Sequence, residues 1–312
     1  MRNRFFSGLL TAALVDPDLV LITADLGFGA VDDFAAARPA QFVNCGVAEQ
    51  NMAGLAAGIA LGGGRVFTYS IANFPTLRCL EQIRNDICYH HADVTVVAVG
   101  GGLAYGALGM SHHATEDLAI MRALPGMAVA APGDPAEVDA VLDDLLTSGG
   151  PAYLRLGKTG ERTVHTAGVS APRGASIFAR DNGENRVLLC STGAILDEVS
   201  VAADDLGADV RSFPWLDPFD AAAIRDAAAT YRLIVTVEEH SIVGGLGSAV
   251  AEVLAESAAG TPLLRIALPN QSSSVVGDQQ FLRTAFELDA ESISRRVRNH
   301  LEANRGLASQ IR

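Results

Sequence analysis

The chain has 312 residues, of which 49% are hydrophobic and 19% are charged. At the usual size of about 100–200 residues per domain, this length predicts two domains, and the composition favours a sizeable core over disorder. Acidic residues outnumber basic residues by 36 to 23, which gives a net charge of −13. Because such a surface repels nucleic acid and anionic membranes, we expect neither as a partner, although a basic pocket for a small anion is compatible with it.

The N-terminal segment contains an apolar run, residues 5–15, that follows two arginines and superficially resembles a short signal peptide. Apolar side chains recur in it at helical spacing, as at Phe5, Leu9 and Ala13. Asp16-Pro17-Asp18 then ends the run without a small-residue cleavage site. We therefore predict an amphipathic first helix of a cytoplasmic protein. No apolar stretch is long enough to cross a bilayer.

Short β-rich runs then alternate with helical patterns. The predicted strands cover residues 19–23, 66–70, 94–99, 127–131 and 152–156. The predicted helices lie near residues 49–61, 77–89, 116–123 and 135–146. Such alternation predicts a mostly parallel, doubly wound sheet with helices on both faces, and hence the α/β class.

A polar segment at residues 158–185, rich in Gly, Arg and Asp, interrupts this alternation and is typical of a linker with one extra strand. The alternation resumes afterwards. Strands are predicted at residues 187–191, 210–213, 233–237 and 263–267, and helices near residues 194–206, 221–228, 247–257 and 292–303. We therefore predict a doubly wound domain over residues 1–170, a linker over residues 171–185, and a smaller α/β domain over residues 186–312.

The four cysteines are Cys45, Cys79, Cys88 and Cys190. No two of them form a C-x-x-C pair, and their spacing fits no zinc site. They are interpreted as ordinary buried thiols in a reducing compartment.

The segment from Asn44 to Gly58 reads NCGVAEQNMAGLAAG and places a carboxylate, Glu49, near the start of a helix of mostly small residues. A glutamate in a first turn commonly does no more than complement the helix macrodipole. However, Gly54 and Gly58 each cost about 1 kcal/mol of helical stability relative to Ala. Since small residues allow close approach, this pattern predicts that Glu49 lies in a dry, tightly packed interface.

The GVAEQN motif in this segment resembles the cofactor-activating motif of transketolases and related thiamine-dependent enzymes. Other segments resemble the family in the same order along the chain: TADL from residue 23, FTYSIANFPTLRCLEQIRND from 67, GALGMSHHATED from 106, PGMAVAAPGD from 125 and EEHSIVGGLG from 238. On these motifs the chain resembles the C-terminal, pyrimidine-binding subunit of a split transketolase. The resemblance covers most of the chain and implies a pyrimidine-binding domain followed by a smaller transketolase C-terminal domain.

The resemblance also implies how the cofactor, thiamine diphosphate, is activated. The family glutamate that matches Glu49 hydrogen-bonds a ring nitrogen of the aminopyrimidine, and this helps to deprotonate the thiazolium carbon that attacks a ketose carbonyl. The hard chemistry belongs to the cofactor. A carboxylate in a low-dielectric slot suits the task, because a proton-sharing hydrogen bond is strong there. Phe74 is expected to stack on the aminopyrimidine, with Tyr69 as a further neighbour, although aromatic residues after strands commonly belong to the core.

Further residues match family positions near the substrate. His112 matches the histidine that contacts the substrate near its reacting carbon, whereas His113 is expected to be structural. Asp25 matches an acid near the thiamine and substrate channel, with a cap after a strand as the equal alternative. Arg2 matches an arginine that grips a sugar phosphate, at a terminus prone to fraying. His240 is expected to serve packing or subunit contact.

The family motifs that hold magnesium and the cofactor diphosphate, a G-D-G motif and a later Asn, are missing. Gly277-Asp278-Gln279 and Gly133-Asp134-Pro135 both lack the closing glycine. A magnesium diphosphate needs oxygen ligands and backbone N–H donors. We therefore assign no metal ligand to this chain. A partner chain, the N-terminal diphosphate-binding subunit, is expected to hold Mg²⁺ and the diphosphate, by analogy in an α2β2 heterotetramer.

Two departures from the family concern the substrate. Leu108 stands where many transketolases have an acid that contacts a donor hydroxyl, and Ala131 stands where many have a phosphate-gripping arginine. They predict a donor or acceptor other than an ordinary sugar phosphate. The expected activity is that of a ketol transferase (EC 2.2.1.-) of carbohydrate metabolism, active only with its partner, which moves a two-carbon unit from a ketose donor to an aldehyde acceptor.

Three alternatives stay open. The β subunit of a 2-oxoacid dehydrogenase E1 component has the same architecture and would decarboxylate a 2-oxo acid. Gly100-Gly101-Gly102 partly meets the G-x-G-x-x-G spacing of a dinucleotide loop, but Tyr105 occupies the third glycine position. A non-catalytic scaffold subunit could retain the fold, although it has no chemical need for Glu49.

Overall fold

The first half of the chain forms six strands of a seven-stranded sheet, and β10 from the second half is the seventh. The computed structural model describes residues 1–166, 168–182, 186–257 and 260–310. The strand order is β10-β5-β6-β4-β3-β1-β2, and every neighbouring pair is parallel except β10 with β5. The strands are β1 (Leu19–Thr23), β2 (Phe42–Asn44), β3 (Arg65–Ile71), β4 (Val94–Val99), β5 (Ala128–Ala130), β6 (Ala152–Leu156) and β10 (Trp215–Asp217).

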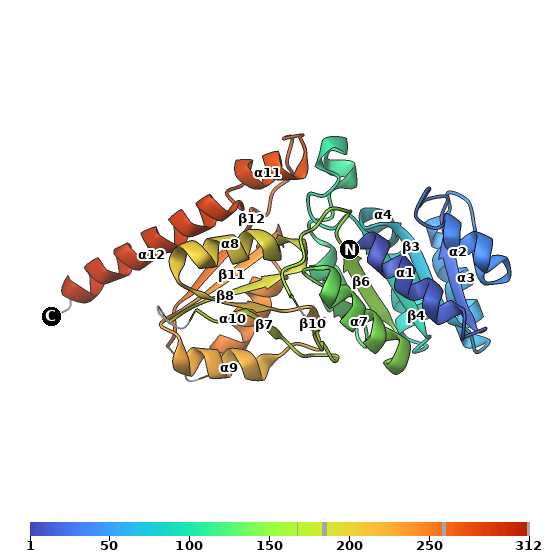
Figure 1. Ribbon diagram of the computed structural model, residues 1–312, viewed down its shortest axis with the longest axis horizontal. Helices are drawn as coiled ribbons and strands as arrows, with labels where there is room; N and C mark the ends of the chain where they lie inside the picture. The colour runs from blue at the N-terminus through green and yellow to red at the C-terminus, as the bar shows by residue number, and fades with distance from the viewer. Residues whose placement is uncertain (167, 183–185, 258–259, 311–312) are drawn as a thin grey trace.

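Helices cover both faces of this sheet, as Figure 1 shows. They are α1 (Arg2–Ala13), α2 (Asp32–Ala37), α3 (Glu49–Leu61), α4 (Asn73–Leu77), α5 (Leu80–Gln82), the π-helical turn η2 (Ile83–Cys88), α6 (Asp117–Arg122) and α7 (Pro135–Ser148). One apolar layer contains residues of α3 and η2, and the other contains residues of α1 and α7. Val66 belongs to the first layer and Phe67 to the second, because successive side chains of a strand point to opposite faces.

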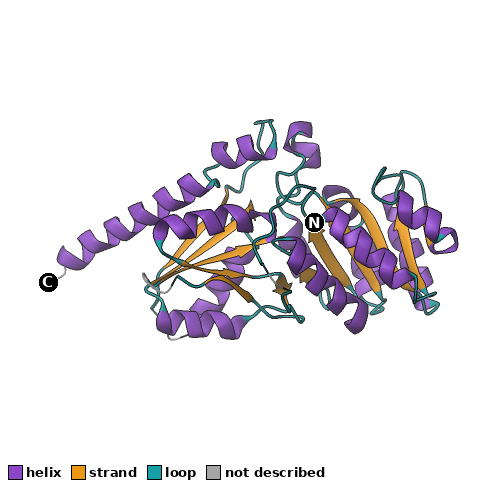
Figure 2. Cartoon of the chain, viewed as in Figure 1, coloured by secondary structure: helices purple, strands orange, loops and turns teal. Residues whose placement is uncertain are grey.

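A five-stranded sheet follows, with the order β12-β11-β8-β9-β7 and with β7–β9 as its antiparallel pair. Its strands are β7 (Ile177–Arg180), β8 (Val187–Thr192), β9 (Asp209–Ser212), β11 (Leu233–Ser241) and β12 (Leu263–Leu268). Its helices are α8 (Leu196–Leu206), α9 (Ala221–Thr230), α10 (Leu246–Glu256), α11 (Gln279–Ala285) and α12 (Ala290–Gln310). Figure 2 shows two such layered α/β units side by side, which confirms the predicted fold class.

Most predicted elements are confirmed, and β7 is the extra strand expected in the polar segment. The helix predicted at residues 77–89 is instead divided into α4, α5 and η2. Helix α4 starts before the predicted helix and tolerates Pro75 in its first turn, where backbone N–H groups have no intrahelical acceptor. The sequence analysis does not predict strands β2 and β10, which have three residues each. No helix that the described residues form has both the length and the apolarity to span a membrane.

Strand β10 joins the two halves of the chain. It follows β9 of the second sheet but pairs with β5 at the edge of the first sheet. Trp215 on β10 is 1% exposed, and its indole Nε1 donates a hydrogen bond to the Ala171 carbonyl at 2.9 Å. The first sheet is therefore completed by a segment that lies far along the chain.

Substitution of Trp215 by Ala is expected to lower the free energy of unfolding by about 3–5 kcal/mol, the usual loss when a large buried aromatic side chain is removed. Denaturant unfolding of the purified chain measures this change. Val201, half-exposed on α8, provides the control, since Val201→Ala should change the free energy by no more than about 0.5 kcal/mol. Equal stability of the two variants would contradict the anchoring role of Trp215.

A buried acid–histidine cluster connects α7 to the segment after β6. Asp134 caps α7 by accepting the Glu137 N–H at 2.9 Å, and it also accepts the His165 N–H at 2.8 Å. Burial opposes ionisation of Asp134, but its hydrogen bonds with His165 and with backbone N–H groups lower its pKa to about 2. Glu137 is fully buried, and this burial raises its pKa to about 7, although the Gly133 N–H, Ser212 and His165 favour its charged form.

The raised pKa of Glu137 predicts a pH effect on stability. The folded chain holds the Glu137 proton more tightly than the unfolded chain, so this contribution to stability is present below pH 4.5, the ordinary value, and is lost as the pH rises through about 7. Glu137→Gln removes this titration. Relative to the wild type, we expect the variant to gain up to about 3 kcal/mol between pH 4.5 and pH 8, measured by unfolding at both pH values. Asp143→Asn, an exposed change on the same helix, should show no such relative gain.

Candidate functional site

Several predicted site residues follow neighbouring parallel strands of the first sheet. Asp25 comes after β1, Glu49 after β2 and Phe74 after β3, while His112 lies in the long segment between β4 and α6. The carboxyl ends of parallel strands lie at one edge of a sheet, where open α/β sheets bind their ligands. The strand order therefore brings these segments to a common edge.

Glu49 begins α3 and is 3% exposed. Its Oε2 lies 2.7 Å from Nη1 of Arg78, whose half-exposed side chain comes from the segment between α4 and α5. The burial predicted for Glu49 is thus achieved within this chain. Gly54 and Gly58 lie on the exposed side of α3, where an added Cβ would meet no described atom within 4 Å.

The surroundings of Glu49 disfavour charge. Burial raises the pKa of Cys79 to about 12, and the negative charge of Glu49 acts in the same direction. Burial also raises the pKa of Cys45, again with a contribution from Glu49. Both thiols are therefore protonated near neutral pH, which agrees with poor solvation around the carboxylate.

Phe74 and His112 lie together beside Arg78. The centroids of the Phe74 and His112 rings are 5.2 Å apart in an edge-to-face arrangement. The Arg78 guanidinium carbon lies 4.8 Å from the centroid of the Phe74 ring. Asn73 Nδ2 donates to the Ser111 carbonyl at 2.7 Å and so ties α4 to the His112 segment. A chain of contacts thus joins Glu49, through Arg78 and Phe74, to His112.

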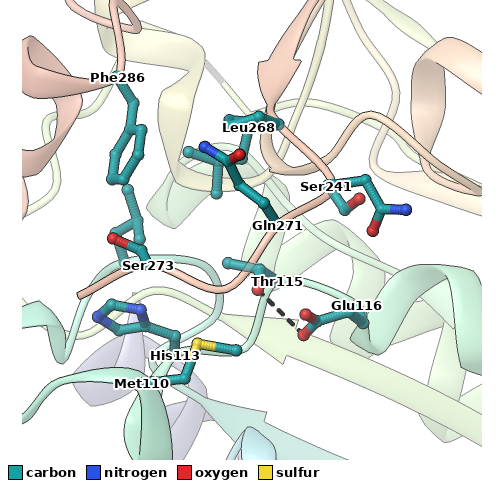
Figure 3. Close-up of a pocket in the computed structure, with 12 residues that line it drawn as sticks. Met110, His113, Thr115, Glu116, Ser241, Leu268, Gln271, Ser273 and Phe286 are labelled. Atoms are coloured by element: carbon teal, nitrogen blue, oxygen red, sulfur yellow. Dashed lines mark hydrogen bonds between the residues drawn. The ribbon is translucent and has the colours of Figure 1, made fainter. Parts of the chain in front are cut away.

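The neighbouring His113 side chain does not belong to this group of contacts. It is 2% exposed and lines a narrow pocket between the two halves of the chain. Figure 3 shows His113 near Ser273 and Phe286, which belong to the second half. His240 is also buried at this junction, where its Nε2 accepts the Ala119 N–H at 3.3 Å.

Asp25 is exposed and pairs with Asn44. The Asp25 N–H donates to Asn44 Oδ1 at 3.0 Å, and Asn44 Nδ2 donates to Asp25 Oδ1 at 3.1 Å. The Gly46 N–H donates to the same Asn44 oxygen at 3.0 Å. Asp25 therefore braces the turn that leads into Glu49, and this places it beside the start of α3.

Tyr69 and Arg2, the first residue of α1, form a separate group. Tyr69 is 2% exposed, and its ring centroid lies 4.8 Å from that of Phe6. Burial raises the pKa of Tyr69 well above its usual range, while the adjacent Arg2 side chain opposes the shift. Arg2 also lies near Tyr105, over whose ring the Lys158 ammonium is placed at 5.1 Å from the centroid. The ring and charge contacts of Tyr69 within the described chain include neither Phe74 nor Glu49.

Sequence reasoning missed Arg78, Asn44 and Lys158. Arg78 and Asn44 fall inside the motifs that resemble the family but carry no signal of their own. Lys158 offers a weak signal, since it is a cation that closely follows the buried strand β6.

A cluster of potential metal ligands in the described part of the chain consists of Asp134, Glu137 and His165, whose ligand atoms lie within 4.8 Å of one another. These residues belong to α7 and the segment after β6, and none is on the elements that carry Glu49 or Phe74. Their hydrogen bonds cap α7 through Asp134 and connect it to Val164 and His165.

Residues 1–162 match the transketolase pyrimidine binding domain, and residues 178–293 match the transketolase C-terminal domain. The chain belongs to the transketolase family. It is 35% identical to a subunit of the apulose-4-phosphate transketolase of Phocaeicola vulgatus, over 94% of each chain. It is 34% identical to a putative transketolase C-terminal section of Methanocaldococcus jannaschii, over 97% of this chain and 96% of that one.

A solved structure described as a split gene transketolase, inactive beta4 tetramer, superposes with a TM-score of 0.85 at 34% identity, over 96% of each chain. By contrast, this chain covers only 47% of the 1-deoxy-D-xylulose-5-phosphate synthase of Bordetella avium, at 32% identity. These matches confirm the resemblance to one subunit of a split transketolase and favour it over the 2-oxoacid dehydrogenase alternative.

Because Glu49 and Arg78 form an ion pair, we expect that substituting both will not lower the free energy of unfolding by the sum of the two single losses. Arg78→Leu leaves the buried carboxylate without its cation and should lower the free energy of unfolding by about 1–3 kcal/mol, less than for a fully buried pair because Arg78 is half-exposed. The double variant with Glu49→Gln should lose less than the sum of the single losses. Denaturant unfolding measures all three variants, with exposed Arg84→Leu as the control. Strict additivity would show that the pair is not coupled.

Proposed function

We propose that this chain is the pyrimidine-binding subunit of a two-chain, thiamine-diphosphate-dependent ketol transferase. The observation that carries the proposal is Glu49, a buried carboxylate at the start of α3 within contact distance of Arg78 and close to the Phe74–His112 pair. The transketolase family provides the cofactor and the reaction type. A ketose donor, rather than a 2-oxo acid, separates this proposal from the dehydrogenase alternative.

The residues around Glu49 suit an aminopyrimidine ring. The hydrogen bond that Glu49 makes to Arg78 within the described chain involves Oε2, which leaves Oε1 available to share a proton with a ring nitrogen. Phe74, which is half-buried, offers an aromatic face to orient the ring. When bound, the cofactor would supply the nucleophilic carbon and accept electrons during C–C cleavage. His112 would hydrogen-bond a hydroxyl or carbonyl oxygen of the donor, and Asp25 would hold the turn before Glu49 in place.

A partner chain completes the site in this proposal by holding Mg²⁺ and the diphosphate. The exposed glycine side of α3, together with Val47, which is 77% exposed, and the exposed Leu55, offers a closely approachable apolar surface. Relatives that are each named as one subunit of a transketolase support the existence of a second chain. We further propose an α2β2 assembly. A cytoplasmic location stays a prediction from the sequence.

The substrate is proposed to be a ketose with an anionic group at the end remote from its carbonyl. Arg2 and Lys158 lie around Tyr105 and supply two cations for such a group, with Tyr69 as a neighbour of Arg2. Leu108 is exposed, whereas Ala131 is fully buried and could not touch a ligand at the surface. Relatives act on apulose 4-phosphate or 6-deoxy-6-sulfo-D-fructose, according to their names. A phosphate or a sulfonate would suit the two cations, and a substrate other than an ordinary sugar phosphate stays a prediction from the sequence.

The predicted domain limits are kept as part of the proposal: residues 1–170, with the pyrimidine site, and residues 186–312, joined by residues 171–185. Support comes from the two sheets, whose strands β1–β6 and β8–β12 fall largely on either side of that linker. Strand β7 lies within the linker and β10 crosses to the first sheet, so the two units are expected to fold together.

Glu49→Gln tests the function. Gln keeps the shape but cannot share its proton as a carboxylate does, so we expect a loss of about 10²–10⁴-fold in kcat for ketol transfer by the two-chain complex. Calorimetric titration should show that thiamine diphosphate with magnesium still binds the variant complex tightly and does not bind this chain alone. Exposed Glu81→Gln on α5 serves as the matched control and should retain full activity.

Each contrary result points to a different error. Full activity of the Glu49→Gln complex would favour a scaffold subunit. Tight binding of thiamine diphosphate by the isolated chain would place a diphosphate site on it. If neither the chain nor the complex binds thiamine diphosphate, both the proposed cofactor and the proposed reaction are contradicted.

A further inference from the structure

The segment that carries His112 is a loop closed at its base. Gly102 and Ala114 form an isolated antiparallel bridge, with N–H to carbonyl distances of 2.8 Å and 3.0 Å. Between them the chain makes two short 3-10 turns, η3 (Gly106–Leu108) and η4 (Met110–His112). The position of His112 therefore depends on how this base is held.

The second domain contacts both sides of this base. The Leu103 N–H donates to Glu239 Oε1 at 2.6 Å, on the outgoing side of the loop. On the returning side, the Ser241 N–H donates to the Thr115 carbonyl at 2.7 Å. Glu239 and Ser241 both belong to the end of β11. The end of β11 is thus hydrogen-bonded to the loop on both of its sides.

Arg155 of β6 adds a third connection to the same base. Its Nη2 donates to the Ala114 carbonyl and to the Glu239 carbonyl, each at 2.9 Å. Its Nε lies 3.1 Å from Asp117 Oδ2. The buried guanidinium of Arg155 therefore connects the first sheet both to the loop base and to the backbone of Glu239.

Glu239 is itself fixed in orientation. It is 5% exposed, and its Oε2 accepts a hydrogen bond from Arg283 Nε at 2.7 Å. Gln279 Nε2 donates to Oε1 at 2.8 Å. The approach to the loop is close: a Cβ at Gly102, whose φ is +66°, would lie 2.6 Å from Glu239 Oε1. Gly102 is therefore required both by its backbone conformation and by the carboxylate.

We propose that Glu239 is a positioning residue through which the C-terminal domain places His112 against the substrate. This inference rests on the proposed role of His112. Glu239 acts through the Leu103 N–H, in a charge-assisted hydrogen bond that is shielded from water and is therefore stronger than a neutral one. A hydrogen bond from Asn73 to the Ser111 carbonyl holds the tip of the loop next to His112 but not its base. The position of the His112 ring thus depends on contacts at the tip and at the base of the loop.

The test uses Glu239→Gln and Glu239→Asp in the two-chain complex. Gln puts an amide where Arg283 and Gln279 both donate, while Asp keeps the charge but is one methylene too short to reach both Leu103 and Arg283. A displacement of about 1 Å at a catalytic group can cost about 100-fold, so we expect kcat for ketol transfer to fall by about 10–100-fold in both variants. Thiamine diphosphate affinity should be unchanged, because Glu49, Phe74 and Arg78 lie on other elements.

Asp197→Asn, which removes the charge of a different partner of Arg283, is the matched control and should retain wild-type kcat.

Two readouts separate positioning from general damage. In a His112→Ala background, Glu239→Gln should cause little further loss of kcat, because its effect passes through the missing imidazole. Hydrogen exchange of the backbone amides at residues 103–113 should be faster in Glu239→Gln than in Asp197→Asn, while α3 keeps its protection. Additive kinetic losses, a parallel loss of cofactor affinity, or unchanged exchange in the loop would each overturn the proposal.

The exchange measurement also separates this proposal from the proposed function. A wild-type complex without ketol transfer would refute the function, yet the exchange of residues 103–113 would still report whether Glu239 anchors the loop. Should Glu239→Gln fail to fold, the charge-preserving Glu239→Asp variant provides the same comparison.

Discussion

A carboxylate that is almost removed from water needs a compensating charge, since an unpaired buried charge is strongly unfavourable. At Glu49 that charge comes from Arg78, which is 29 residues later in the chain. The pair holds the start of α3 against the segment between α4 and α5, and the same guanidinium lies over Phe74. The pair thus fixes the relative position of the carboxylate and the aromatic ring, which are the two groups that suit an aminopyrimidine.

The parallel sheet makes this arrangement possible. Strands β1, β2 and β3 are neighbours, so the segments that follow them start at the same edge. Asn44 and Asp25 connect two of these segments, and Asn73 connects the third to the His112 loop. Hydrogen bonds between neighbouring loops therefore hold groups from four separate segments of the chain close together.

The second domain contributes to this site without carrying any of its proposed ligand-contacting residues. The carboxyl end of β11 reaches the base of the His112 loop through Glu239 and Ser241, and β10 completes the first sheet. Substrate contact and domain packing are consequently linked by the same hydrogen bonds. This link gives a physical reason for the second domain to be part of the subunit, because without it the edge of the first sheet would lose β10 and the loop base would lose its hydrogen bonds to Glu239 and Ser241.

The sequence by itself determined the elements that depend on local pattern. The buried strands at 19–23 and 94–99 coincide with β1 and β4, because runs of β-branched and other apolar residues favour a covered parallel strand. The small residues of α3 and the GVAEQN motif indicated Glu49 and the family. Only the tertiary structure decided that Arg78 neutralises Glu49, that Lys158 lies over Tyr105, that Tyr69 lies with Arg2, and that Glu239 holds Leu103 from 136 residues away. Periodicity records which face of an element is buried, whereas pairs of this kind depend on how distant segments pack, and no local pattern encodes that.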